Sequence, residues 1–170
     1  MEQILYFIGQ GLGVIAVILG FVNYQVKTRE QVLLVNIATT LCFVLHYMLI
    51  GAFSGMAMNL VGFVRGIVFY FVGKNGKVAR GWAILFAAIM CIIGIIGWEA
   101  WYSVFVVVAL MINSYALSFS DPQNIRKSIL ITSPMVIVYD SFVLSFGGIV
   151  YESVAIISSV IGLWRFKKES

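Results

Sequence analysis

The residues that could do chemistry are few, and almost all of them interrupt long apolar runs. They are His46, Tyr47, Asn59, Arg65, Tyr139, Asp140 and Glu152, together with Asn23 and Asn113. Polar side chains inside an apolar segment usually face a protein interior or a wet cavity, where they pair with one another or bind a solute. The set offers hydrogen bonding and charge neutralisation. It contains no Ser or Cys nucleophile paired with a base and no metal-ligand spacing such as HExxH, so no cofactor is predicted.

Arg65 is the most informative of these residues because it lies deep inside its apolar run. At about 1.5 Å of rise per residue, its head group lies roughly 13 Å from the nearer end of its helix, too far to reach water easily. We therefore expect a partner, which would be Asp140, Glu152 or an anionic substrate. The alternative is an ion pair that only locks two helix bundles together.

Asn59 shares a helical face with Gly55, Gly62, Gly66 and Tyr70. Glycines at this spacing let helix backbones approach closely, as is common in membranes. One interpretation is a cavity wall on which Asn59 hydrogen-bonds a solute. The other is plain helix–helix packing.

His46, Tyr47, Tyr139 and Asp140 are predicted to form an outer gate of carboxylate, phenol and imidazole. A histidine can also sense pH near neutrality. The alternatives are a histidine that only hydrogen-bonds a neighbour and a carboxylate that is simply hydrated near the membrane interface.

The elements that carry these residues must be membrane helices. Of the 170 residues, 62% are hydrophobic and 11% charged, and the mean hydropathy is +1.03. Soluble domains are about 45–50% apolar and about 25% charged, which excludes a soluble enzyme; disordered chains lack such apolar content. Cys42 and Cys91 lie inside apolar runs, where a buried thiol is expected rather than a disulfide framework. The chain is predicted to be a polytopic membrane protein.

Seven apolar segments have the roughly 17–25 residues that a membrane helix needs. They are Ile4–Tyr24, Val32–Ile50, Gly55–Val72, Trp82–Gly97, Trp101–Ser118, Ile129–Phe146 and Ile149–Phe166. Tight turns are expected at Gly51 to Ser54 and at Gly147-Gly148. The sequence thus predicts an all-α membrane protein with seven transmembrane helices.

Basic residues predict the orientation of these spans. Ten of the eleven lie on one side of a seven-span arrangement, namely Lys27, Arg29, Lys74, Lys77, Arg80, Arg126, Lys127, Arg165, Lys167 and Lys168. Cytoplasmic loops accumulate Lys and Arg, so the N-terminus is expected outside and the C-terminus in the cytoplasm. The same clustering between apolar segments argues against nucleic acid as a partner and for the lipid bilayer.

The sequence also suggests an internal repeat of three helices. Aligning the two predicted hairpins places Gly55 opposite Gly148. Under this offset His46 matches Tyr139, Tyr47 matches Asp140, and Asn59 matches Glu152; with a loop insertion, Asn23 matches Asn113. The prediction is a first three-helix bundle at residues 1–73, a linker helix at 74–98 and a second three-helix bundle at 99–170, arranged 3+1+3. Parallel repeats of this kind occur in transporters, with a substrate site between the halves.

Chain direction gives the polar residues two depths. His46, Tyr47, Asn59, Tyr139, Asp140 and Glu152 form a shell near the outer face, while Asn23, Asn36 and Asn113 form a sparser one near the inner face. Arg65 lies between the shells. Two polar shells around an apolar middle would suit a gated pathway.

The stretch from His46 through Ser54-Gly55-Met56-Ala57-Met58-Asn59 to Gly62-Phe63-Val64-Arg65-Gly66 resembles the YgjV family of bacterial inner-membrane proteins. In plan this family is similar to the SWEET/MtN3 sugar carriers, the PQ-loop transporters and the PnuC-type vitamin transporters. The resemblance implies a bacterial inner-membrane location and a solute that passes between two three-helix bundles. SWEET-type carriers use prolines in several spans as hinges, whereas here Pro134 alone lies within a predicted span.

The leading hypothesis is a small-solute carrier that works by alternating access between the two bundles. The solute would be neutral or weakly anionic, such as a sugar or a vitamin-like nucleoside, because Asn side chains and one arginine are the available binding groups. One alternative is an intramembrane enzyme that uses His46 with Asp140 or Glu152 as acid–base partners. Another alternative is a non-transporting membrane scaffold. The sequence also leaves open whether the chain forms a homo-oligomer.

Overall fold

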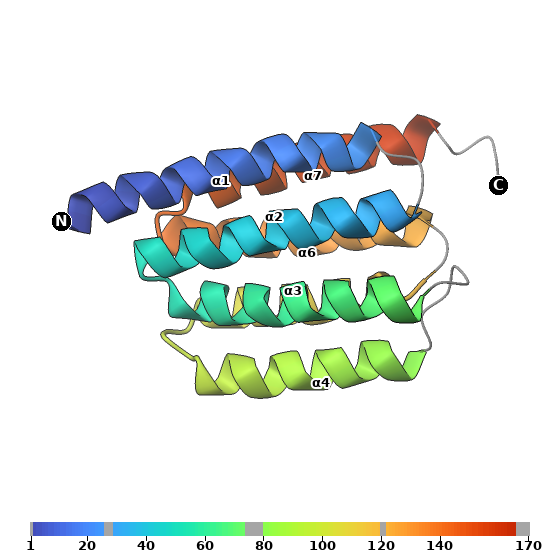
Figure 1. Cartoon of the computed structure of the whole chain (residues 1–170), viewed down its shortest axis with the longest axis horizontal. Coiled ribbons are helices and arrows are strands. Elements are labelled where there is room, and N and C mark those ends of the chain that lie inside the picture. Colours follow the sequence, from blue (N-terminus) through green and yellow to red (C-terminus); the bar gives the residue numbers. More distant parts are fainter. Residues whose placement is uncertain (1, 26–28, 74–79, 120–121, 166–170) are drawn as a thin grey trace.

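The computed structural model describes residues 2–25, 29–73, 80–119 and 122–165, and the regular elements in these ranges are all α-helices. They comprise seven helices: α1 (Glu2–Gln25), α2 (Arg29–Ile50), α3 (Phe53–Val72), α4 (Arg80–Ile96), α5 (Ser103–Ala116), α6 (Pro122–Phe142) and α7 (Phe146–Arg165). Successive helices run in opposite directions, so α1 begins at the end of the bundle opposite to that where α7 finishes (Figure 1). The predicted all-helical fold class is confirmed.

The helices form two layers, with α1 to α4 side by side in one and α7, α6 and α5 behind them (Figure 1). Neighbour contacts run from α1 to α2, α3, α5, α6, α7 and back to α1, so these six helices close into a ring. Helix α4 packs outside this helix ring, against α3 and α5. The ring places α2 and α6 opposite each other, and both carry several of the polar residues singled out above.

The two ends of the bundle differ in charge. At one end α2 and α4 begin with Arg29 and Arg80, and the first turns of α6 contain Arg126 and Lys127. We call this the basic end. At the other end α2 finishes, α3 begins and the α4–α5 turn contains Glu99; we call it the Glu99 end. The predicted basic residues at 27, 74, 77, 167 and 168 lie outside the described residues.

The boundary between α6 and α7 differs from the prediction. Helix α6 begins earlier, at Pro122, because proline is well tolerated in a first helical turn, and it ends at Phe142 rather than Phe146. Leu144 has a φ of 54°, which breaks the helix before α7. The Gly147-Gly148 turn was therefore a wrong prediction, since α7 begins at Phe146 and both glycines lie in its first turn.

By length and apolar composition, four helices in the described residues can cross a membrane. They are α1, α2, α3 and α7, with apolar stretches at Gln3–Val22, Leu33–Ile50, Phe53–Val72 and Phe146–Trp164. Helices α4 and α5 are apolar but shorter. Large apolar side chains such as Ile96 and Trp164 are exposed on the outside, as a lipid-covered surface requires. The chain is a membrane protein with several apolar helices.

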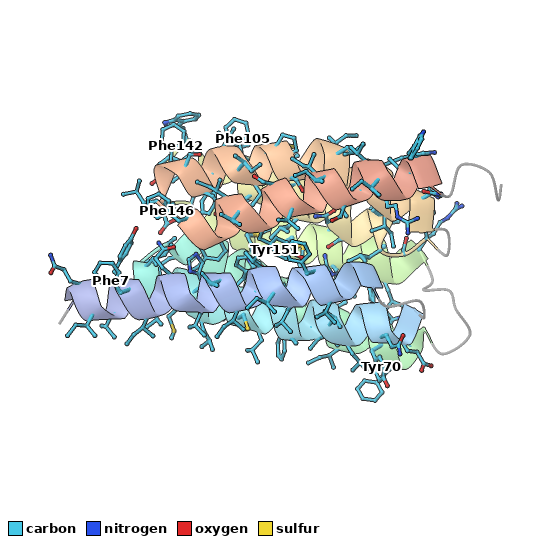
Figure 2. The ribbon with its side chains drawn as sticks, turned by 90° about the horizontal axis from the view of Figure 1, so that it is seen from above. Phe7, Tyr70, Phe105, Phe142, Phe146 and Tyr151 are labelled. Atoms are coloured by element: carbon cyan, nitrogen blue, oxygen red, sulfur yellow. The ribbon has the colours of Figure 1, made fainter. Side chains whose placement is uncertain are left out.

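Two close contacts hold α1 against α7. Helices α1 and α7 cross where Gly13 meets Gly147; a Cβ atom added to Gly13 would lie 2.9 Å from the Gly147 Cα. Tyr151 fills the space between the same two helices farther along, against Gly20 (Figure 2). Close backbone approach through glycines is the usual packing of membrane helices.

The α4–α5 turn holds the start of α3. The Phe53 and Ser54 backbone N–H groups donate to the two carboxylate oxygens of Glu99, at 2.7 and 3.1 Å. The Ser54 hydroxyl also donates to the Gly97 carbonyl and lies 3.0 Å from the Ser103 hydroxyl. A carboxylate here satisfies backbone donors that have no partner inside the helix and complements the helix dipole.

Candidate functional site

Four polar side chains from the facing helices α2 and α6 meet at the Glu99 end. Tyr47 Oη donates to Asp140 Oδ1 at 2.6 Å, and the Gly55 backbone N–H donates to Tyr139 Oη at 2.7 Å. His46, Tyr47, Tyr139 and Asp140 are all fully buried or nearly so. The structure therefore brings the four residues predicted as an outer gate into one place.

His46 uses both of its ring nitrogens. Its Nδ1 lies 2.8 Å from the Gly9 carbonyl oxygen on α1, and its Nε2 lies 2.7 Å from Ser145 Oγ in the α6–α7 turn. The Gly148 N–H donates to the same Ser145 Oγ at 3.2 Å. The Gly9 carbonyl can only accept, so Nδ1 carries a proton and donates to it, and Nε2 shares the second hydrogen bond with the Ser145 hydroxyl. We call His46, Tyr47, Tyr139, Asp140 and Ser145 the polar layer.

The polar layer is buried and packed with aromatic rings. The Tyr47 ring stacks on Phe43 and meets Tyr139 edge-on, with ring centroids 5.8 and 6.0 Å apart. Asp140 Oδ2 has no hydrogen bond of regular geometry, and Ser145 lies beside it. A side chain at Gly148 would collide with this carboxylate. The layer closes this end of the helix ring.

Glu152 and Asn59 lie deeper than the polar layer. Ser133 on α6 lies beside the Glu152 carboxylate. Asn59 Nδ2 donates to the Gly55 carbonyl at 2.9 Å, a bond within its own helix. In this conformation Asn59 turns its amide along α3 rather than across to the other half of the chain.

Arg65 has a different partner from the two carboxylates that the sequence suggested. Its Nη1 donates to Ser114 Oγ on α5 at 2.7 Å, and neither Asp140 nor Glu152 lies within ion-pair distance. The reason is depth. At about 1.5 Å per residue Arg65 lies roughly 18 Å from the Glu99 end of α3, whereas Asp140 lies roughly 3 Å from that end of α6.

The inner asparagines are only partly described. Asn113 Oδ1 on α5 accepts hydrogen bonds from the Ser128 and Thr132 hydroxyls of α6, each at 3.3 Å. Asn36 Oδ1 on α2 is buried without a partner. The side chain of Asn23 lies outside the described part of the structure. The sparser inner shell thus consists, where described, of amides and hydroxyls near the basic end.

Sequence reasoning missed the hydroxyl groups. Ser114 and Ser145 form hydrogen bonds with Arg65 and His46, and Ser133 lies beside Glu152. Serine is common in membrane helices, and its spacing here carries no distinguishing signal. Only the position of Ser145 before a helix start, where serine is a favoured cap, could have been read from the sequence.

The described residues contain no group of three His, Cys, Asp or Glu side chains that could hold a metal ion. The enzyme hypothesis required His46 to work with Asp140 or Glu152. Both nitrogens of His46 are instead occupied by Gly9 and Ser145. Ser145 is fully buried and accepts a hydrogen bond from the first turn of α7, which is what a helix cap does.

The model of one protein family, Imp-YgjV, described as bacterial inner membrane protein, matches residues 7–170. The match therefore covers nearly the whole chain, including all the residues of the site. No curated protein and no solved structure matches the chain.

Proposed function

The chain belongs to the Imp-YgjV family of bacterial inner membrane proteins, and from this premise we propose that it is a seven-span carrier for a small solute. The resemblance that the sequence suggested is thereby confirmed at the level of the family. In the proposal the solute passes between residues 1–73 and 99–170 by alternating access, and the helix at 74–98 links the two halves.

The order of helices around the ring supports two equivalent halves. If α1, α2 and α3 correspond to α5, α6 and α7, the contacts of α2 with α1 and α3 map onto those of α6 with α5 and α7. The two remaining contacts, α3 with α5 and α7 with α1, become two equivalent seams. Helix α4 lies outside the ring, where a linker belongs. This arrangement suits parallel repeats with a pathway between them.

The observation that carries the proposal is the closure of one end by hydrogen bonds between the halves. The bonds from Tyr47 to Asp140, from Gly55 to Tyr139 and from His46 to Ser145 each join the first half to the second. A purely structural seam in a membrane needs no such polar contacts, whereas a gate benefits from bonds that water can replace when it opens.

The charge distribution supports the direction in which this gate faces. The described basic residues Arg29, Arg80, Arg126, Lys127 and Arg165 lie at the end of the bundle opposite to the polar layer. Under the positive-inside rule that end is cytoplasmic, so the polar layer would close the outer mouth and the N-terminus would lie outside.

The enzyme and scaffold alternatives have less support. A buried helix cap is a poor nucleophile, and Ser145 is the hydroxyl that His46 contacts. A scaffold would need surface for a partner, but the described connections between α2 and α3 and between α6 and α7 are short turns.

A cross-link across the gate tests the proposal. In a background with Cys42 and Cys91 changed to alanine, cysteines replace Tyr47 and Asp140, and a short bifunctional methanethiosulfonate reagent spans the gap that the long tyrosine side chain bridges. Uptake of a panel of small sugars, nucleosides and organic acids into proteoliposomes should stop on cross-linking and return with a reductant. Each single-cysteine protein, treated alike, serves as the control. Unchanged uptake in the cross-linked protein, or no uptake of any solute by the wild type, would contradict the proposal.

A further inference from the structure

Arg65 is a buried cation with no counter-ion among the described side chains. Its side chain is 4% exposed, and a guanidinium stays charged at any pH that a protein meets. Its one hydrogen bond goes to the neutral Ser114 hydroxyl. An isolated charge is far too costly to bury in an apolar interior, so the structure calls for an anion here.

The guanidinium has one edge free. Nη1 is used by Ser114, and Nε is buried without a partner. Nη2 makes no hydrogen bond with the described residues; it lies 3.8 Å from where a Cβ of Gly62 would be. The Nε–H and Nη2–H groups point the same way, and this pair binds a carboxylate through two parallel hydrogen bonds.

The four carboxylates whose side chains the structure describes lie elsewhere. Asp140 accepts from Tyr47, Glu152 lies beside Ser133, and Glu99 holds the start of α3. Glu30 is exposed in the first turn of α2. None of these four carboxylates contacts Arg65, so no carboxylate among the described side chains neutralises it.

The surroundings of the free edge point inside the helix ring. Gly62 leaves space between Arg65 Nη2 and the methyl group of Thr40 on α2. One turn from Thr40 on the same helix lies Asn36, whose Oδ1 is also buried without a partner. Arg65 and Asn36 are each about 10 Å from the basic end of their helices, so an unused donor and an unused acceptor share one level.

We propose that the free Nε–Nη2 edge of Arg65 binds the carboxylate group of a small monocarboxylate, which enters through the basic end, while Ser114 holds the Nη1 side of the guanidinium. The single positive charge of Arg65 determines the charge class of the ligand, because a dianion such as a phosphate ester would leave one negative charge buried and uncompensated. The inference rests on the proposed function in placing this site on the solute pathway. It narrows the solute from neutral or weakly anionic to a monoanion.

Binding is tested apart from transport, on the full chain in detergent. The thermal unfolding midpoint is followed while sodium acetate, propionate or lactate is added, with chloride, nitrate and succinate at equal ionic strength for comparison. A ligand of the native state raises this midpoint in proportion to the logarithm of its concentration once it exceeds the dissociation constant. We expect the monocarboxylates to raise it and the other three salts to do so weakly or not at all.

Variants then assign the effect to the free edge. Arg65→Lys keeps the charge but loses the paired donors, and Arg65→Met removes the charge; we expect each to weaken carboxylate binding roughly tenfold or more. Gly62→Val should block the edge with a similar loss. The matched control, Lys127→Gln, removes an exposed charge at the basic end and should bind as the wild type does. Because Arg65→Met removes an unpaired buried charge, we expect it to fold in carboxylate-free buffer.

Each outcome bears on the inference. Equal stabilisation by chloride or nitrate would show that the site binds inorganic anions without preference for a carboxylate, which would overturn the inference. An unchanged response in Arg65→Lys and Arg65→Met, or no response in the wild type, would overturn it as well. Carboxylate binding without any uptake into proteoliposomes would support the binding site and contradict the proposed carrier function. Uptake of neutral solutes alone, with no carboxylate binding, would support the carrier function and overturn the carboxylate site.

Discussion

At the scale of residues, the polar layer closes one end of the bundle with a few short hydrogen bonds instead of apolar packing. Tyr47 and Asp140 make the most direct of these contacts, at 2.6 Å between two fully buried side chains. A buried carboxylate that loses its donor keeps the whole cost of its desolvation. The strength of the closure should therefore depend strongly on single hydroxyl groups.

Tyr47→Phe removes the hydroxyl but keeps the ring that stacks on Phe43. We expect the free energy of unfolding to fall by about 1–3 kcal/mol, because Asp140 Oδ1 loses its donor. Denaturant unfolding in mixed micelles measures the change. Tyr115→Phe is the control, since the Tyr115 ring is exposed and its hydroxyl makes no hydrogen bond in the described structure. Equal stability of the two variants would show that the Tyr47–Asp140 bond contributes nothing.

Ser145→Ala removes a hydroxyl with two partners, His46 Nε2 and the Gly148 N–H. We expect a loss of about 1–2 kcal/mol in the free energy of unfolding, since the cap of α7 disappears and the imidazole loses a hydrogen bond. The same unfolding assay applies. Ser141→Ala is the control, because Ser141 is exposed and donates within its own helix to Ile137. The assignment fails if Ser145→Ala is as stable as Ser141→Ala.

The sequence indicated which residues matter at this scale better than it indicated their partners. Hydropathy alone picks out a histidine, an aspartate or an arginine inside an apolar run, because each is costly there. Their partners depend on the rotation and depth of helices that are distant in sequence. Arg65 shows the difference: charge favoured a carboxylate partner, but the helix depths put Ser114 beside it instead.

At the scale of elements, close helix crossings set the shape of the ring. The crossing of α1 and α7 brings two backbones together at Gly13 and Gly147. Polar contacts add to it, since Gln10 Nε2 and Tyr6 Oη both donate to the Leu144 carbonyl, at 2.8 and 3.0 Å. At the Glu99 end this seam between the halves is thus held by hydrogen bonds as well as by close packing.

Gly13→Ala tests how closely this seam is packed. The added methyl group would lie 2.9 Å from the Gly147 Cα and 3.3 Å from His46 Nδ1, so a backbone must move. We expect the free energy of unfolding to fall by about 1–3 kcal/mol. Gly11→Ala is the matched control, because a Cβ at Gly11 meets no atom within 4 Å and alanine favours the helix. If both variants unfold alike, the crossing is looser than the structure shows.

Helix positions were predictable from the sequence, but one pair of boundaries was not. Apolar runs place the helices because burying or solvating them in lipid is the dominant favourable term. The first turns of α6 are polar and contain Arg126 and Lys127. Hydropathy therefore predicted a start at Ile129, whereas the helix begins at Pro122. Gly147-Gly148 looked like a turn because glycine favours turns, whereas here the glycines serve the close packing against Gly13 and Asp140.

At the scale of the whole molecule, charge and closure lie at opposite ends. The polar layer is at the Glu99 end, and the described basic residues other than Arg65 are at the other end. Anions that approach the basic end meet a favourable potential, which raises their local concentration. Under the proposed function, a solute held by Arg65 would lie between an attracting inner mouth and a closed outer gate.

The orientation of the chain gives the last prediction. In a background with both native cysteines changed to alanine, Trp98→Cys places a thiol in the exposed α4–α5 turn, and Lys127→Cys places one at the exposed start of α6. Because basic segments are retained in the cytoplasm, we expect a membrane-impermeant maleimide to label Trp98→Cys in cells with a permeabilised outer membrane. Lys127→Cys should react only after the inner membrane is opened. Labelling in the opposite order would show that the protein has the opposite orientation, with the polar layer at the cytoplasmic mouth. Labelling of both thiols from one side would exclude seven alternating spans.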